Sequence, residues 1–180
     1  IFKTTGNDNI FLATRNGMAI CFNENDARAV GRTASGVKAI DLADGDYVVG
    51  AEPVREDSKV LLVTDGGYGK CTDLTSFRIQ HRGGKGLKAY KITEKTGNII
   101  GISMVNDSEE LIMVTSEGVV IRIRIKDIAT TTGRITQGVR LINLDDGVTV
   151  VSMDKISAED AVEEESEENN TEVTTETTEE

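Results

Sequence analysis

The sequence predicts an all-β protein of about three four-stranded units, arranged as consecutive blades of a propeller-like array and followed by a disordered acidic tail. A segment of about fifty residues recurs three times along the chain. Each copy is rich in β-branched residues and turn glycines, and no window shows the apolar period of a helix. Three blades are too few to close a ring, so we expect about half of a larger disc, with unpaired edges.

The repeat is visible in both halves of the unit. The first half recurs as DNIFLATRNGMAICF (8–22), SKVLLVTDGGYGKCT (58–72) and EELIMVTSEGVVIRI (109–123). The second half recurs as GRTASGVKAIDL (31–42), HRGGKGLKAYKI (81–92) and GRITQGVRLINL (133–144). We therefore place the copies at about residues 8–57, 58–106 and 109–153, within one domain of residues 1–155.

Each unit is expected to contain four short strands of its own. An apolar run such as Val60–Val63 leads through a glycine turn into a partly alternating strand. A basic glycine loop follows, and then a strand such as Val37–Leu42. After another turn, the unit ends with a strand such as Tyr47–Glu52.

The net charge of -11 comes from the C-terminal residues. Residues 156–180 hold eleven acids and no base, which leaves 20 acids and 20 bases on residues 1–155. This tail has almost no large apolar residue, so burial cannot offset the entropy of ordering it, and we predict that it is disordered. The rest of the chain is neutral overall, so the acidic average does not argue against a polyanionic partner.

Other features point to a soluble, cytoplasmic protein without a membrane partner. No apolar run approaches the roughly 18 residues of a membrane span, and no basic-then-apolar leader is present. The chain starts at Ile1 in what reads as the end of a strand, which suggests a fragment of something longer. Cys21 and Cys71 lie far apart without further ligands at metal spacing, so we expect two buried, reduced thiols.

The basic residues fall at the same phase of each unit. The middle copy shows this best, because FRIQHRGGKGLKAYK (77–91) holds five bases and no acid. Cations that recur at one phase of stacked blades form a continuous band along one rim. Such a band suits the backbone of duplex nucleic acid, where neutralising phosphates releases counterions. Glycines allow backbone N–H groups to approach phosphate oxygens, and the scarcity of aromatic residues disfavours a reader of single strands.

Other classes of function have weaker support. His81 has no nucleophile and acid arrangement around it, and no acid pair or metal set recurs, so we predict no catalytic residue, no metal ligand and no cofactor in this segment. A kelch-like propeller that binds proteins is a possible alternative, but its tryptophan is absent. Arg122, Arg124 and Lys126 alternate along one face of a predicted strand. They are as compatible with protection of an exposed sheet edge as with binding of DNA.

Four features together resemble the C-terminal domain of the bacterial DNA gyrase A subunit. They are QHRGGKG (80–86), the pair GRTASGVKAIDL and GRITQGVRLINL, TDGGYGK (64–70), and the acidic tail. The resemblance implies a β-pinwheel of about six blades, a propeller-like disc that binds duplex DNA around a basic perimeter and wraps it. It also implies a holoenzyme of gyrase A and gyrase B subunits that uses ATP and Mg²⁺ to introduce negative supercoils, and a nucleoid-associated location in a bacterium.

The gyrase-A box of that family carries over to residues 80–86, although in the family the box belongs to the first blade. The catalytic tyrosine lies elsewhere in the family's full-length protein, so we expect this segment to be non-catalytic. The main alternative is the corresponding domain of topoisomerase IV, which has degenerate boxes. The acidic tail could compete with DNA for the basic rim, or it could simply keep the protein soluble. The combined candidate DNA-binding residues are Arg32, Lys38, Gln80, His81, Arg82, Gly83, Gly84, Lys85, Gly86, Lys88, Arg122, Arg124, Arg134 and Arg140.

Overall fold

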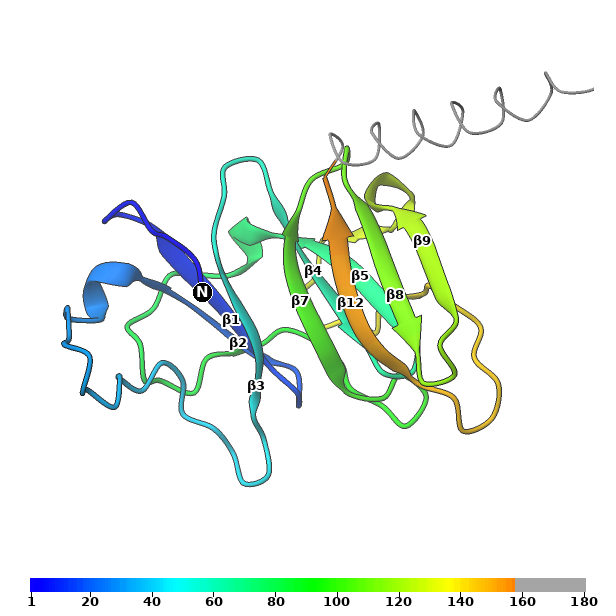
Figure 1. Ribbon diagram of the computed structural model, residues 1–180, viewed down its shortest axis with the longest axis horizontal. Helices are drawn as coiled ribbons and strands as arrows, with labels where there is room; N and C mark the ends of the chain where they lie inside the picture. Colours follow the sequence, from blue (N-terminus) through cyan, green and yellow to red (C-terminus); the bar gives the residue numbers. More distant parts are fainter. Residues whose placement is uncertain (158–180) are drawn as a thin grey trace, which may run out of the picture.

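Three β-sheets stand side by side in the computed structural model, which describes residues 1–157 (Figure 1). The predicted disorder of the tail concerns residues that lie, from 158 on, outside the described part. Helical structure in residues 1–157 is limited to three single turns, η1 (Glu24–Asp26), η2 (Leu74–Ser76) and η3 (Ile125–Asp127). None of these turns is long enough to cross a membrane. The predicted all-β class is confirmed.

Each sheet is built around a hairpin from one copy of the repeat. The first sheet has the order β3-β1-β2-β6, with β1 (Asn9–Thr14), β2 (Met18–Asn23), β3 (Val48–Pro53) and β6 (Leu87–Lys88). The second has the order β10-β5-β4-β7, with β4 (Lys59–Thr64), β5 (Tyr68–Asp73), β7 (Ile99–Val105) and β10 (Thr130–Thr131), and β11 (Val139–Arg140) also pairs with β5. The third has the order β12-β8-β9, with β8 (Glu110–Thr115), β9 (Val120–Arg124) and β12 (Val150–Ile156).

The same tight turn closes the three hairpins. Gly17 donates its N–H to the carbonyl of Thr14 at 3.1 Å, and Gly67 and Gly118 make the equivalent bonds in the other units. All three glycines have a positive φ, which other residues rarely adopt, so the recurring glycine follows from the turn itself.

The sheets pack face to face, which explains the different apolar patterns of their strands. Val60 and Leu62 of β4 face the first sheet and contact a core that includes Phe11, whereas Leu61 and Val63 face the third sheet. A strand buried on both faces reads as a continuous apolar run. Strand β9 alternates between exposed and half-buried positions, because among the described residues only its inner face is covered.

The fold differs from the prediction in one respect: the outer strands are exchanged between units. Strand β6 belongs to the second copy but pairs with β2 of the first, and β10 and β11 belong to the third copy but pair with β5 of the second. The predicted strand at Val37–Leu42 is therefore wrong, since no strand forms there. This segment is equivalent to β6, but residues 1–157 provide no preceding hairpin edge for it to join.

A partly buried polar network links the inner strands β3, β7 and β12, which pack against one another. The Glu52 carboxylate accepts hydrogen bonds from Ser103 Oγ at 3.1 Å and from Met104 N at 2.9 Å. Lys155 Nζ donates to the Met104 carbonyl at 2.5 Å and lies 4.0 Å from Glu52 and 3.8 Å from Glu109. All three units therefore contribute to one set of contacts.

Candidate nucleic-acid interface

The basic segments form three loops, which we call the first (residues 28–42), second (78–92) and third (130–144) basic loops. The second loop runs along the edge of β2, where Met18 pairs with Lys88 and Gln80 donates its N–H to Cys21 O at 2.8 Å. The third loop runs along the edge of β5 in the same way, with Tyr68 paired to Arg140. Each of these two loops thus covers an edge of the preceding hairpin that would otherwise be unpaired.

Consecutive basic loops also contact each other directly, and the contacts repeat. Arg82 donates from Nη1 to the Lys38 carbonyl at 3.0 Å, and Arg134 donates from Nε to the Lys88 carbonyl at 3.1 Å. The two arginines occupy equivalent places in the repeat, as do the two lysines. The three loops therefore lie in the order first, second, third, with their cations in register.

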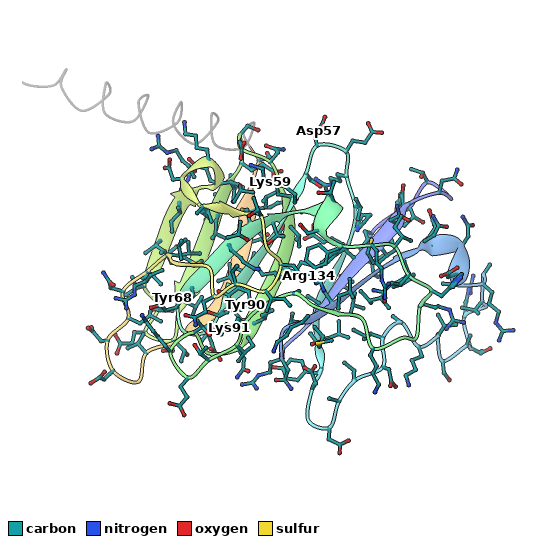
Figure 2. All side chains as sticks on the ribbon, turned by 180° about the vertical axis from the view of Figure 1, so that it is seen from behind. Asp57, Lys59, Tyr68, Tyr90, Lys91 and Arg134 are labelled. Atoms are coloured by element: carbon teal, nitrogen blue, oxygen red, sulfur yellow. The ribbon has the colours of Figure 1, made fainter. Side chains whose placement is uncertain are left out.

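A backbone contact of the same kind accompanies each arginine. Asp41 N donates to Gly84 O at 2.9 Å, and Lys91 N donates to Thr136 O at 3.0 Å. Figure 2 shows Tyr90, Lys91 and Arg134 close together where the second and third loops meet. Because main-chain and side-chain bonds recur together, the spacing between loops is set by the fold and not by flexible side chains alone.

Gly86 is required by close packing of the second loop on β2. Its φ is +72°, and a Cβ added there would lie within 3.0 Å of the Ala19 carbonyl group. Gly138 of the third loop repeats this arrangement over Gly69. The equivalent Gly36 of the first loop has a φ of +82° but nothing within 4 Å of the added atom.

The main chains of Gly83 and Gly84 form hydrogen bonds with the first basic loop. Gly83 donates its N–H to the Ala39 carbonyl at 2.6 Å. The sequence suggested that this N–H could approach a phosphate oxygen, but it is already used within the protein. The Gly84 carbonyl accepts a hydrogen bond from Asp41 N, and the residue is exposed. A Cβ at either glycine would meet no atom closer than 3.7 Å, so the approach of the two loops does not require them, and only Gly83, with a φ of +81°, is favoured by its backbone conformation.

The cations of the loops differ in how much they are used by the protein. Arg82 is half-buried and donates from Nε to Asp26 O at 2.8 Å in addition to its bond to Lys38. His81 is exposed, with Nδ1 3.2 Å from a carboxylate oxygen of Asp26. Lys38 forms an ion pair with Asp41, which lowers the pKa of that carboxyl group. The side chains of Arg32, Lys85 and Lys88 are exposed.

Arg122 and Arg124 are not brought into this row of loops. Both lie on β9, where Arg122 forms an ion pair with Glu110 and Arg124 Nε lies 2.9 Å from Asp127 Oδ2. A cation beside a carboxylate presents little net charge to a phosphate. Their positions therefore agree better with charged protection of a strand edge.

Arg140 belongs to a cluster that sequence reasoning missed in part. Its Nε and Nη2 atoms lie 3.1 and 3.0 Å from Tyr68 Oη, and this contact lowers the pKa of the phenol. Lys95 Nζ lies 5.6 Å from the centre of the Tyr68 ring, on a turn outside the basic loops. Nothing in the repeat marks Lys95, because only the fold brings its turn beside the third loop.

The arrangement of charges is that of a binding surface. Among residues 1–157, no group of three or more His, Cys, Asp or Glu side chains is placed to hold a metal ion. The basic loops instead offer exposed cations at a regular repeat, supported from below by main-chain bonds. This arrangement can neutralise a regularly spaced polyanion.

The chain is similar in sequence to known proteins. The family described as DNA gyrase C-terminal domain, beta-propeller, matches residues 8–55, 58–106 and 109–157. The DNA gyrase A subunit of Staphylococcus epidermidis is 46% identical over 159 residues, which are 87% of this chain and 18% of that protein. The same protein of Ureaplasma parvum is 45% identical over 153 residues, with 85% and 18% covered. The chain thus spans about a fifth of the length of these curated relatives.

Solved structures show the same fold. The C-terminal domain of DNA topoisomerase IV matches with a TM-score of 0.83 and 27% identity, covering 94% of this chain and 53% of that one. The DNA gyrase A C-terminal domain matches with a TM-score of 0.78 and 25% identity, covering 85% and 52%. The predicted fold class and the predicted resemblance are therefore confirmed. With three consecutive segments matched over most of its length, this chain belongs to the family of DNA gyrase C-terminal domains with a beta-propeller fold.

Proposed function

We propose that this chain binds duplex DNA along its row of basic loops and bends it, as part of the C-terminal domain of a DNA gyrase A subunit. The observation that carries the proposal is the repeated loop contact, Arg82 to Lys38 and Arg134 to Lys88, which keeps cations of successive units in line. The names of the curated relatives, which are DNA gyrase A subunits, support it.

The mechanism is electrostatic. Lys85, Lys88 and Arg32 are exposed and would neutralise phosphates, releasing counterions. Arg82 and Arg134 mainly hold the loops at their spacing, although each retains N–H groups that could reach a phosphate. Bending about 20 to 30 base pairs by 40 to 90° costs on the order of 1 to 6 kcal/mol, so contacts must be distributed along the curved surface. A row of loops in register provides this distribution.

The activity of a whole gyrase lies beyond this chain and forms part of the proposal. We propose that the chain works with the remainder of gyrase A and with gyrase B in ATP- and Mg²⁺-dependent negative supercoiling, in the cytoplasm and at the nucleoid of a bacterium. The cofactor chemistry belongs to those other parts. The corresponding protein of topoisomerase IV is the second candidate, favoured by the structural match to its C-terminal domain, but the curated relatives cited above are gyrase subunits.

DNA binding tests the proposal. Fluorescence anisotropy with a labelled duplex of about 30 base pairs, at several salt concentrations, should give an affinity that falls steeply with salt. The double variant Lys85→Gln/Lys88→Gln should bind more weakly and reduce the salt slope by about 1.8, or about 0.9 for each phosphate that is no longer neutralised. End-to-end energy transfer on the same duplex should increase on binding if the DNA is bent.

Arg55→Gln/Lys59→Gln is the control for net charge, with Lys59 paired to Asp107 at 2.8 Å in the native chain. It removes the same charge near the turn between β3 and β4, and Figure 2 shows Asp57 and Lys59 of this region well away from Lys91. Equal losses of affinity in the two double variants would show that net charge, and not the row of loops, governs binding. An affinity that does not change with salt would remove the electrostatic mechanism.

A further inference from the structure

Lys70 is a buried cation in the middle of β5. Its side chain has no solvent exposure, and Nζ donates to the Arg134 carbonyl at 2.6 Å and lies 3.4 Å from the Gly133 carbonyl. Burial lowers the pKa of the ammonium group to about 8, and no neighbouring charge contributes to this shift. A buried lysine held by carbonyl groups is costly, so a role for its charge is expected.

The repeat shows that this lysine is not needed for the fold of a unit. Lys70 lies opposite Leu62 in the hairpin, and the equivalent positions of the first and third hairpins hold Ile20 and Ile121. An apolar residue therefore fits this place in two units of three. The next basic loop runs along the edge of the first hairpin as well, beside Ile20, so what distinguishes the second unit is that Lys70 binds main-chain carbonyls of the loop that covers it.

Tyr90 holds the same loop at a second point. It is fully buried, its hydroxyl donates to Gln137 O at 2.5 Å, and Lys70 Nζ lies 5.3 Å from the centre of its ring. A Cβ on Gly138 would lie 2.9 Å from Tyr90 Oη, so the loop sits directly on the phenol. Lys70 and Tyr90 thus fix the carbonyl groups on either side of Ile135.

We propose that Lys70 is a positioning residue for DNA binding, because its ammonium group holds the third basic loop in line with the second by binding the carbonyls of Gly133 and Arg134. The proposal rests on the proposed function and extends it. Arg134 connects this loop to the Lys88 carbonyl of the second loop, so a displacement of the Arg134 main chain would change the distance between the cations of the two loops. Lys70 contacts no phosphate itself.

The charge of Lys70 has a second effect at this place. The third loop carries two bases where the second carries five, and Gln137 stands at the place of Lys85. A charge beneath the loop is poorly screened by solvent ions and adds to the field above it. Lys70 therefore adds to the field of a loop that has fewer cations of its own, without neutralising a phosphate itself.

The pH dependence follows from the groups around Nζ. They are the Tyr90 phenol, whose pKa is raised by burial, the permanent cation Arg134, and Leu62 on β4. The lowered pKa of the Lys70 ammonium group, about 8, lies within the range from pH 7 to 9.5. DNA binding should therefore weaken over this range as the ammonium group loses its proton.

The variant Lys70→Ile tests the proposal, since isoleucine stands at both equivalent positions. At pH 7 it should bind the duplex about tenfold more weakly, the effect of one charge-assisted hydrogen bond. Its salt slope should equal that of the native chain, and its affinity should change less between pH 7 and 9.5. The comparison variant Lys88→Gln should instead lower the slope by about 0.9, as expected for an exposed phosphate contact. Lys70→Met serves in the same way if the isoleucine variant does not fold.

Amide hydrogen exchange in residues 133–138, measured without DNA, separates this proposal from the proposed function. Faster exchange in Lys70→Ile, confined to this loop, supports the positioning role even if the native chain binds no duplex, in which case the proposed function alone fails. Unchanged exchange together with unchanged affinity would overturn the role of Lys70. A salt slope reduced as in Lys88→Gln would also overturn it, since it would mean direct contact with phosphate.

Discussion

Replacing Gly86 with alanine should reveal how strongly the second basic loop depends on its contact with β2. The residue has a φ of +72°, and the new Cβ would lie within 3.0 Å of the Ala19 carbonyl group and 3.2 Å from Ile40 Cδ1. The left-handed backbone costs about 1 to 2 kcal/mol for a residue with a Cβ. Overpacking against the rigid β2 backbone adds about 1 to 3 kcal/mol. We therefore expect a loss of about 2 to 5 kcal/mol in the free energy of unfolding.

Gly36→Ala is the matched control, because Gly36 has the same place in the repeat and a φ of +82° but an added Cβ meets nothing within 4 Å. It should lose only the backbone contribution of about 1 to 2 kcal/mol. Urea unfolding followed by circular dichroism, with linear extrapolation to water, measures both losses. Equal losses at the two positions would refute the argument that Gly86 is required by packing against the neighbouring unit.

Three further predictions concern buried or partly buried polar groups. The pKa of Lys70 is about 8 in the folded chain and 10.5 in the unfolded chain, so the unfolded chain binds more protons between pH 8 and pH 10.5. The free energy of unfolding should therefore rise with pH over this range, by about 3 kcal/mol more than in Lys70→Ile. Parallel pH profiles of the two chains in chemical denaturation would contradict this. Cys71 is buried, and burial raises the pKa of its thiol to about 11. A thiol reagent at pH 8 should therefore label Cys71 only when denaturant is added. Rapid labelling of the native chain would contradict this, because it would show that the thiol is accessible. Glu52→Gln keeps one carbonyl acceptor for Ser103 or Met104 but loses the charge, so it should lower the free energy of unfolding by about 1 to 3 kcal/mol. The control Glu56→Gln, on the exposed turn, should have no effect. Equal urea midpoints for the two variants would mean that the network adds no stability.

The fold was largely predictable because its information is local and repeated. Apolar runs such as Val60–Val63 and the recurring turn glycines define hairpins without knowledge of their neighbours. The exchange of outer strands was not predictable in this way. Val37–Lys38 and Leu87–Lys88 have similar sequences and different structures, because a strand of this length forms only when an adjacent hairpin offers its edge.

The candidate site was predictable to the extent that it depends on phase in the repeat. The sequence placed Arg82 and Arg134 at equivalent positions, and the structure shows equivalent contacts for them. It could not show that these arginines donate to carbonyls of the next loop. Lys70 was missed because a lysine in a strand reads as exposed, and only the passing of a distant loop over β5 buries it.

The exchange of outer strands also determines where this chain can be cut. Removing a repeat at its sequence boundary takes away that repeat's hairpin and, in addition, the closing strand of the hairpin before it. A truncation after residue 57, at the end of the first copy, therefore bares the edge of β2, whereas a truncation after residue 92 keeps the basic loop that covers it. Because each basic loop covers the preceding hairpin, a repeat grafted from a relative at the repeat boundaries mixes native and foreign strands in two sheets.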